Sequence, residues 1–442
     1  MQRLWGEFPF LWTLGGVLAI LLLRSWRDIV WPTATFEDRI NLISLFFSTH
    51  DITLVTRNYN GYASVFPDFI AWLLAGLPAS WIPYAFSCAA MLVCATTMSL
   101  FASQAYRWLL DDDRARQATC LLMAALPLGT NSLVSNLTYT QYNFLFMLFL
   151  LLLQNPAQSW QKNLLVTPFI IACIFSHPGS ILCLLPCLFI LAIAPVQRKF
   201  FTLFFMASAV IYNIFLVDKA VLDMLTPDYI LFRFFIACAA FIGRGILEPL
   251  IGANAAVALL QQAMFLKVAA FSSMAMLLIT LFFGLHCLIK KQLANAAVIV
   301  LFYGGFLIIF VSILTRLTGW GWQQHLYDVS NQRYIYATRL CTLVSIACLL
   351  YPFMQQQFLN RYSRSFLFLL LTGCLLYANT LAFTLYQTDT SNSEKLTAFM
   401  RNIQQEIDSG NVACLQHQDC TRVLADPDPR WPITLDLKNR RP

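Results

Sequence analysis

Charged residues are scarce in this chain of 442 residues, and their scarcity excludes most classes of soluble protein. Only 12% of the residues are Asp, Glu, Lys or Arg, while 59% are hydrophobic, and the mean hydropathy is +0.64. An average soluble domain carries about 25% charged residues. The chain is therefore predicted to be an all-α polytopic membrane protein.

Three other features are missing. Lys and Arg do not cluster into a face that would bind nucleic acid, so the net charge of +7 is better explained by membrane topology and anionic lipid. No small-residue cleavage site follows the first apolar run at about residues 8–23, which is expected to be a retained first span. No internal repeat is visible, and this disfavours transporter folds built from duplicated halves.

Metal-binding and redox cysteine motifs are absent as well, although the chain has 13 cysteines. Most of them lie in apolar runs, where cysteine behaves as a small hydrophobe, and no spacing matches a zinc or redox motif. Cys414 and Cys420 lie instead in the polar tail. If the tail is outside the cytoplasm, these two are expected to form a disulfide.

Apolar runs fill most of the chain up to residue 386, and a span needs roughly 20 apolar residues. About 11 transmembrane helices are predicted on this basis, near residues 8–23, 83–104, 117–130, 137–154, 165–176, 180–195, 201–217, 265–289, 293–315, 336–354 and 365–386. The runs 165–176 and 180–195 are short, and one broken helix is the alternative. Residues 63–77 are read as a re-entrant helix, an interfacial helix or another crossing, and 218–264 as an outward segment with interfacial helices.

The basic residues between these runs orient the predicted helices. The positive-inside rule assigns the loops around Arg107, Lys162 and Lys290 to the cytoplasm, with the N-terminus. The first loop, 24–82, and the tail then lie outside. This divides the chain into a membrane domain, 1–386, and a small extracytoplasmic segment, 387–442, of which residues 393–407 have the pattern of an amphipathic helix.

Two adjacent acids, Glu37 and Asp38, follow the first span. Carboxylates beside hydrocarbon are costly, so they call for an explanation. One interpretation is a general base that takes a proton from an acceptor hydroxyl, and these oxygens are also candidate ligands for a divalent cation, Mg²⁺ or Mn²⁺. The alternative is a solvated helix N-cap.

Farther along the first loop, Arg57 precedes a stretch of amides and tyrosines. The functional interpretation gives Tyr59, Asn60 and Tyr62 to a sugar and Arg57 to a phosphate. The alternative is a plain turn, since Asn-Gly favours positive φ.

Polar side chains also collect where the predicted helix 137–154 begins. Asn136, Thr138 and Gln141 belong to a run that helix capping alone does not explain, and we interpret them as a polar wall of the site. A second polar break, Ser176 to Gly179, is a helix-hairpin turn by its Pro and Gly, with a catalytic role for His177 as an added hypothesis.

Arg333 and Tyr334 stand before the predicted helix 336–354. An arginine here snorkels or grips a phosphate with its fork of donors. Arg333 is the leading candidate for a donor phosphate, with Arg233 and Arg244 as further candidates.

Taken in order, these motifs resemble bacterial multi-pass proteins of the GT-C glycosyltransferase superfamily. The resemblance covers the chain to about residue 340. It implies a GT-C-like architecture and an inverting transferase of the bacterial inner membrane. The enzyme would move a sugar from a polyprenyl-phosphate donor to a surface glycan or a lipid-linked acceptor. Its active site would face outward, with Asp38 or Glu37 as the base.

Two other functions stay open. A flippase or transporter of lipid-linked saccharides would carry ionisable residues along a path at mid-membrane depth. An O-antigen polymerase or ligase would depend on outer-loop arginines rather than on the first-loop acids. The sparse charge of the apolar runs favours the transferase.

Overall fold

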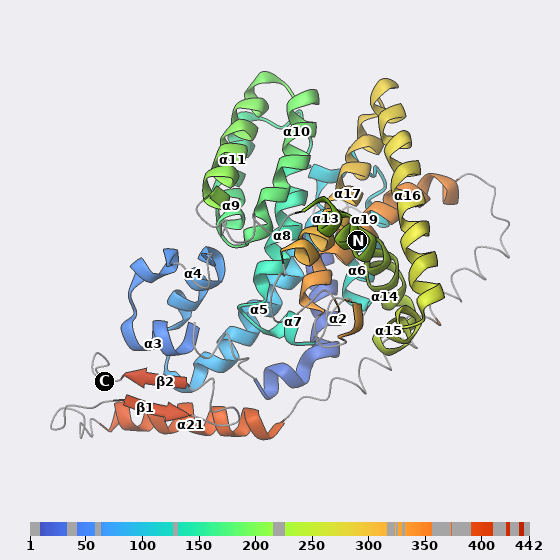
Figure 1. The fold of residues 1–442 in the computed structure, drawn as a ribbon. Coiled ribbons are helices and arrows are strands. Elements are labelled where there is room, and N and C mark those ends of the chain that lie inside the picture. Colours follow the sequence, from blue (N-terminus) through green and yellow to red (C-terminus); the bar gives the residue numbers. More distant parts are fainter. Residues whose placement is uncertain are drawn as a thin grey trace.

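The computed structural model describes residues 9–32, 42–57, 63–126, 131–214, 226–315, 323, 326–328, 332–355, 373, 390–409, 421–424 and 433–436. Within them the chain is almost entirely helical, with one small sheet near the C-terminal end (Figure 1).

The elements follow one another with short connections. The N-terminal half contains α2 (Pro9–Val30), α3 (Leu45–Thr49), η2 (Ile52–Thr56), α4 (Val65–Leu74), η3 (Ala79–Trp81), α5 (Ile82–Ser99), η4 (Leu100–Ala102), η5 (Gln104–Tyr106), α6 (Asp113–Ala125), α7 (Asn131–Ser135), α8 (Thr140–Leu152), α9 (Trp160–Ile174), η6 (Pro178–Cys183), α10 (Leu184–Ile193) and α11 (Val196–Ile214). The C-terminal half contains α13 (Pro227–Ala240), the π-helical η7 (Phe241–Leu247), α14 (Glu248–Ile251), α15 (Ala253–Leu260), α16 (Ala263–Ile289), α17 (Leu293–Leu314), α19 (Arg333–Gln355), α21 (Thr390–Asp408), β1 (Thr421–Leu424) and β2 (Ile433–Asp436).

Six helices in the described part of the chain are long and apolar enough to cross a membrane. They are Pro9–Val30, Ala79–Ala102, Pro227–Ile251, Ala263–Ile289, Leu293–Leu314 and Ile335–Pro352, and four shorter apolar helices accompany them. These helices support the prediction of an all-α membrane protein. The count of 11 spans stays a prediction, and its last member, 365–386, lies outside the described residues apart from one position.

The expectation of an outward segment with interfacial helices at 218–264 needs correction. A continuous helix, Pro227–Ile251, qualifies there as a candidate span. Its charges suggested a loop, but Arg244 and Glu248 form an ion pair with each other inside the protein. Pairing and burial remove these charges from contact with lipid, so a span is compatible with them.

The two short runs around His177 form a hairpin rather than one broken helix. The ring of Trp160 at the start of α9 lies 4.5 Å from Phe201 at the start of α11, and Phe175 after α9 lies 5.0 Å from Tyr212 at the end of α11. α9 and α11 therefore run parallel, and α10 between them must run back.

Glycine permits the closest helix approach in the bundle, between α17 and its neighbours. A Cβ on Gly304 would lie 2.2 Å from Cε1 of Phe149 on α8, and one on Gly305 would lie 3.1 Å from Cβ of Cys341 on α19. Small residues at helix interfaces allow this approach, as is typical of membrane bundles. Of the described cysteines, all are free thiols and all but Cys88 are buried, in line with the prediction that they act as small hydrophobes.

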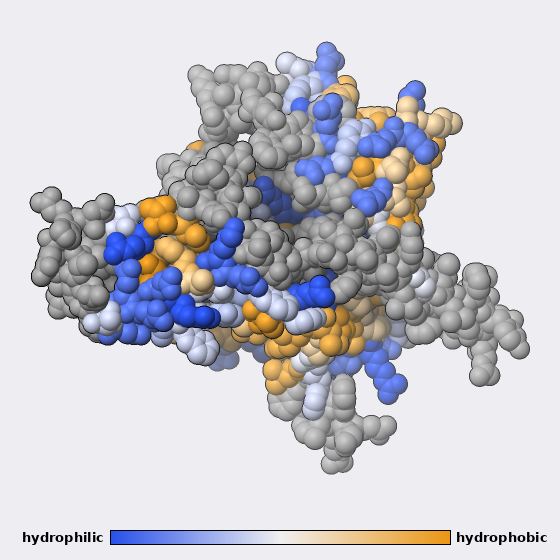
Figure 2. All heavy atoms as spheres, turned by 90° about the horizontal axis from the view of Figure 1, so that it is seen from below, coloured by the Kyte–Doolittle hydropathy of each residue, from blue (hydrophilic) through white to orange (hydrophobic). Residues whose placement is uncertain are grey.

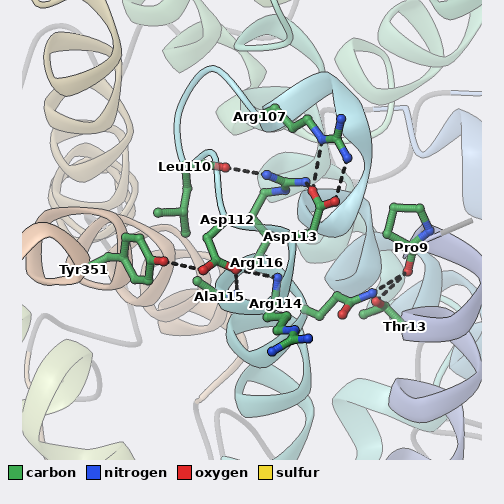
Figure 3. Close-up of polar contacts among 11 residues, drawn as sticks. Pro9, Thr13, Arg107, Leu110, Asp112, Asp113, Arg114, Ala115, Arg116 and Tyr351 are labelled. Carbon is green, nitrogen blue, oxygen red and sulfur yellow. Dashed lines mark hydrogen bonds and ion pairs between the residues drawn. The ribbon is translucent and has the colours of Figure 1, made fainter. Parts of the chain in front are cut away.

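A polar latch joins the start of α6 to the end of α19 (Figure 3). Asp112 accepts hydrogen bonds from the backbone N–H groups of Arg114 (2.7 Å) and Ala115 (3.0 Å), which caps α6, and a further one from the hydroxyl of Tyr351. Asp113 pairs with Arg107 and with the buried Arg116. The loop charges are thus largely neutralised among themselves.

The C-terminal segment packs on the first loop. The predicted amphipathic helix is confirmed as α21, and the residues after it contribute the antiparallel pair β1–β2 rather than only loop. Seen from below, hydrophilic side chains gather at the left, where α21 lies in Figure 1, and hydrophobic ones gather at the right, on the side of α16 (Figure 2). Residues 390–436 and the first loop therefore form a polar-surfaced module beside the apolar helix bundle.

Candidate functional site

Three of the polar motifs found in the sequence meet in space. Nη1 of Arg333, at the start of α19, donates a hydrogen bond of 3.0 Å to the hydroxyl of Tyr139, and its guanidinium lies 5.3 Å from the centre of that ring. Asn136 accepts from the backbone N–H of Tyr139 at 3.3 Å. Segments almost 200 residues apart in sequence, as the separation of 194 for this bond records, thus form one cluster.

The turn at His177 extends this cluster. The His177 ring packs edge-on against Tyr142, with centroids 5.2 Å apart, and Tyr142 lies beside Tyr139 at 6.4 Å. We call Arg333, Tyr139, Tyr142 and His177 the Tyr139 cluster. The backbone N–H of Gly179 donates to Nδ1 of His177 at 2.8 Å, so the neutral imidazole carries its proton on Nε2. Desolvation lowers the pKa of His177 to about 4, so His177 is neutral at pH 7 and is no phosphate-binding cation.

The start of α4 brings the first loop to this turn. The N–H of Phe66 donates to Oγ of Ser176 at 2.9 Å, and the Phe66 ring lies 4.4 Å from that of Phe144 on α8. The hydroxyl of Tyr212 bonds both the N–H (3.1 Å) and the carbonyl (2.9 Å) of Ala63. The first loop is thereby fixed against the turn that carries His177.

An ion pair lies one turn along α4. Oδ2 of Asp68 is 3.5 Å from Nε of Arg57, and the Asp68 side chain is only 3% exposed. Burial raises the pKa of Asp68 to about 7, against the opposing effect of Arg57. A carboxyl group with a pKa near neutrality exchanges protons readily at physiological pH. Arg57 is thus held by an acid, which leaves it poorly suited to hold a phosphate alone.

A second buried network holds Arg244. Glu248 pairs with Arg244 and, at 2.6 Å, with Nη2 of Arg339, and all three side chains are almost fully buried. The remaining nitrogens of Arg244 donate to the carbonyls of Leu326 and Asp328, both at 3.1 Å. Because every printed partner of Arg244 belongs to the protein itself, we assign this network to fixing the segment before α19 rather than to ligand binding.

Arg233 differs from the other three candidate arginines. It is 7% exposed, and its guanidinium lies 4.7 Å from the centre of the Tyr229 ring. Its Nε and Nη1 are buried and have no hydrogen-bond partner in the part of the chain that the structure describes. A buried cation without an acceptor is costly, so an anionic ligand is the simplest partner for it.

Arg233 and Arg333 lie at the same level of the bundle. Thr338 donates to the carbonyl of Gly305, and Ser345 donates to that of Val298, which fixes the antiparallel register of α17 and α19. This register sets Arg333 opposite Phe310. The ring of Phe234, next to Arg233, lies 5.7 Å from that of Phe310.

The remaining predicted site residues divide into two groups. Asn136, Thr138 and Gln141 are buried, so in place of an open polar wall the side chain of Tyr139 is the one that stays partly exposed. The others lie outside the described residues, or in the case of Tyr334 have a described backbone only: Glu37, Asp38, Tyr59, Asn60, Tyr62, Tyr334, Cys414 and Cys420.

Sequence reasoning gave no role to three residues that the structure makes prominent. Asp68, Glu248 and Arg339 each lie in or beside an apolar run. The signal was present, because an ionisable residue inside such a run is expected to be functional or paired. What the sequence does not give is the partner, which in each case comes from tertiary packing.

Among the described residues, no group of three or more His, Cys, Asp or Glu side chains is placed to hold a metal ion. The predicted cation site at Glu37 and Asp38 lies outside those residues. Comparison of this chain with protein-family models, curated proteins and solved structures found no match.

Proposed function

We propose that this protein is an inverting glycosyltransferase of the bacterial inner membrane. It transfers a sugar from a polyprenyl-phosphate donor to a surface glycan or a lipid-linked acceptor on the outer face. The proposal rests on the sequence motifs of a GT-C-like transferase and on what the structure offers at the level of Arg233 and Arg333.

The observation that carries the proposal is the buried guanidinium of Arg233, with Nε and Nη1 unpartnered among the described residues. A lipid-linked phosphate supplies several acceptor oxygens and a tail that belongs in hydrocarbon, so it matches a cation buried in an apolar helix. The leaving group of the reaction is that phosphate, and a fixed positive charge stabilises it as it departs.

The sugar is assigned to the Tyr139 cluster. Its tyrosine rings offer apolar faces to a pyranose, and Arg333 adds donors at the same level as Arg233. The neutral His177, with a proton on Nε2, is suited to donate a hydrogen bond to a hydroxyl rather than to carry charge.

Asp38 or Glu37 is proposed as the base, with a divalent cation as an optional partner. Asp68 is a second candidate from the first loop, since its pKa of about 7 suits proton transfer. In each case the carboxylate takes the proton of the acceptor hydroxyl. The new C–O bond forms at the anomeric carbon as the bond to the phosphate breaks.

The packing of α21 on the first loop supports an odd number of crossings. If α2 spans the membrane, residues 42–82 lie on the side opposite the N-terminus, and the tail must share that side. Six crossings would put the tail on the wrong side, so an odd number of the shorter or undescribed apolar segments also cross. The predicted total of 11 meets this condition.

Phosphate binding gives the direct test. Thermal unfolding of the purified protein is followed with polyprenyl phosphate and with the matching polyprenol. We expect the phosphate to stabilise wild type and R333Q more than the alcohol does, and R233Q to lose this difference. R401Q, on the exposed face of α21, is the matched control. Equal stabilisation of wild type and R233Q by the phosphate would refute the assignment.

Transfer assays then separate the alternatives. In membranes supplied with polyprenyl-phosphate sugars, D38N, E37Q and D68N are compared for product and anomeric configuration. Loss of transfer in one of them, with inversion in wild type, supports the transferase. Full activity of all three would favour the polymerase or ligase, and translocation without transfer would favour the flippase.

A further inference from the structure

The C-terminal helix presents one apolar face to the first loop. Leu396, Met400 and Ile403 lie on the same side of α21, at spacings of four and three residues, and each is at most 2% exposed. They share a hydrophobic core with Phe46 and Ala79 of the first loop. Lys395 and Arg401, on the other face, are exposed. The amphipathic pattern of α21 is therefore used up by the first loop.

Polar contacts and the small sheet fix the register of this packing. Oε1 of Gln404 accepts the N–H of Ala79 at 2.6 Å, at the first residue of η3. Leu435 of β2 enters the same core, and Arg422 of β1 pairs with Glu406 of α21 at 3.0 Å. Residues 390–436 are thus bound to the first loop by an apolar core, a hydrogen bond and a second element.

One short helix connects this core to the Tyr139 cluster. At its C-terminal end α4 buries Ala71 and Ala75 in the core shared with α21. At its N-terminal end Phe66 bonds Ser176, next to His177. Ten residues of α-helix span roughly 15 Å, and a helix transmits a displacement along its axis as a rigid body.

We propose that residues 390–436 are a positioning element for the first loop. α21 holds the C-terminal end of α4, and α4 sets the turn of Ser176 and His177 against Tyr142. Met400 and Gln404 are the positioning residues, and neither touches the Tyr139 cluster in the described structure. The inference concerns the geometry of the loop and turn and stands without the proposed transferase activity.

Hydrogen exchange of the full chain in lipid nanodiscs tests the coupling. Deleting a buried methionine side chain raises the open fraction of its surroundings by a factor on the order of 30 or more. In M400A we therefore expect exchange to quicken by about this factor at residues 65–77 and to quicken measurably at 175–180. R401A, its exposed neighbour on α21, should match wild type at both segments.

A milder pair keeps the test valid if M400A does not fold. Q404A removes the acceptor for the Ala79 N–H, whereas Q404E retains a carboxylate oxygen at that place. We expect Q404A to quicken exchange at 65–77 and 175–180, and Q404E to restore wild-type rates. If Q404A frees α21 alone, and 175–180 exchanges as in wild type, the proposal is wrong.

Discussion

Glu248 neutralises two buried arginines, and E248Q should therefore be severely destabilising. The carboxylate is 2% exposed, and both of its partners, Arg244 and Arg339, are 0% exposed. Glutamine fills the same volume but leaves two guanidinium groups facing each other without a counter-charge. Removing one partner of a buried ion pair costs about 3–5 kcal/mol, and the two-to-one arrangement puts E248Q at the upper end.

The exposed pair of Glu406 and Arg422 provides the control. Its side chains are 40% and 33% exposed, so E406Q should cost at most about 1 kcal/mol. Unfolding of each variant by SDS in mixed micelles, followed by tryptophan fluorescence, gives the free energy of unfolding. If E248Q loses no more stability than E406Q, the assignment of Glu248 as a structural counter-ion is refuted.

Three further predictions address separate parts of the molecule. The folded-state pKa of Asp68, about 7, lies above the model value of 3.8, so the native state binds the extra proton and stability should fall as pH rises from about 4 to 7, by on the order of 4 kcal/mol; D68N should lack this slope in unfolding measured across that range. G304A forces a Cβ against the Phe149 ring and should lower stability by about 1–3 kcal/mol, whereas G15A, with open space around it, should be neutral or stabilising in the same unfolding assay. D112A removes the cap of α6 and should cost about 1–2 kcal/mol, and unchanged unfolding of D112A would show that the latch of Figure 3 is dispensable.

Hydrophobic composition and periodicity largely determined the helices. The predicted runs 265–289 and 293–315 agree with α16 and α17 to within two residues, because a long apolar run has few alternatives to a helix in a membrane. The amphipathic pattern at 393–407 likewise predicted α21. Pattern reasoning failed at Pro227–Ile251, where charged residues suggested a loop.

The candidate site was accessible to sequence reasoning only in part. The motifs around Asn136, His177 and Arg333 were recognised as polar interruptions, and the structure brings Arg333, Tyr139 and His177 into one cluster. Their order along the chain does not state that they touch. It also does not rank the arginines, since Arg233, Arg244 and Arg333 look alike beside apolar runs.

Local sequence therefore determined which segments are helices and which residues are too polar to face lipid, since both follow from the cost of exposing polar groups to hydrocarbon. Tertiary structure decided the partners: Glu248 for Arg244, Asp68 for Arg57, and Tyr229 alone, through its ring, for Arg233. Pairing depends on distances between segments far apart in the chain, and the same arginine becomes a structural ion or a ligand-binding cation according to whether an acid lies within reach.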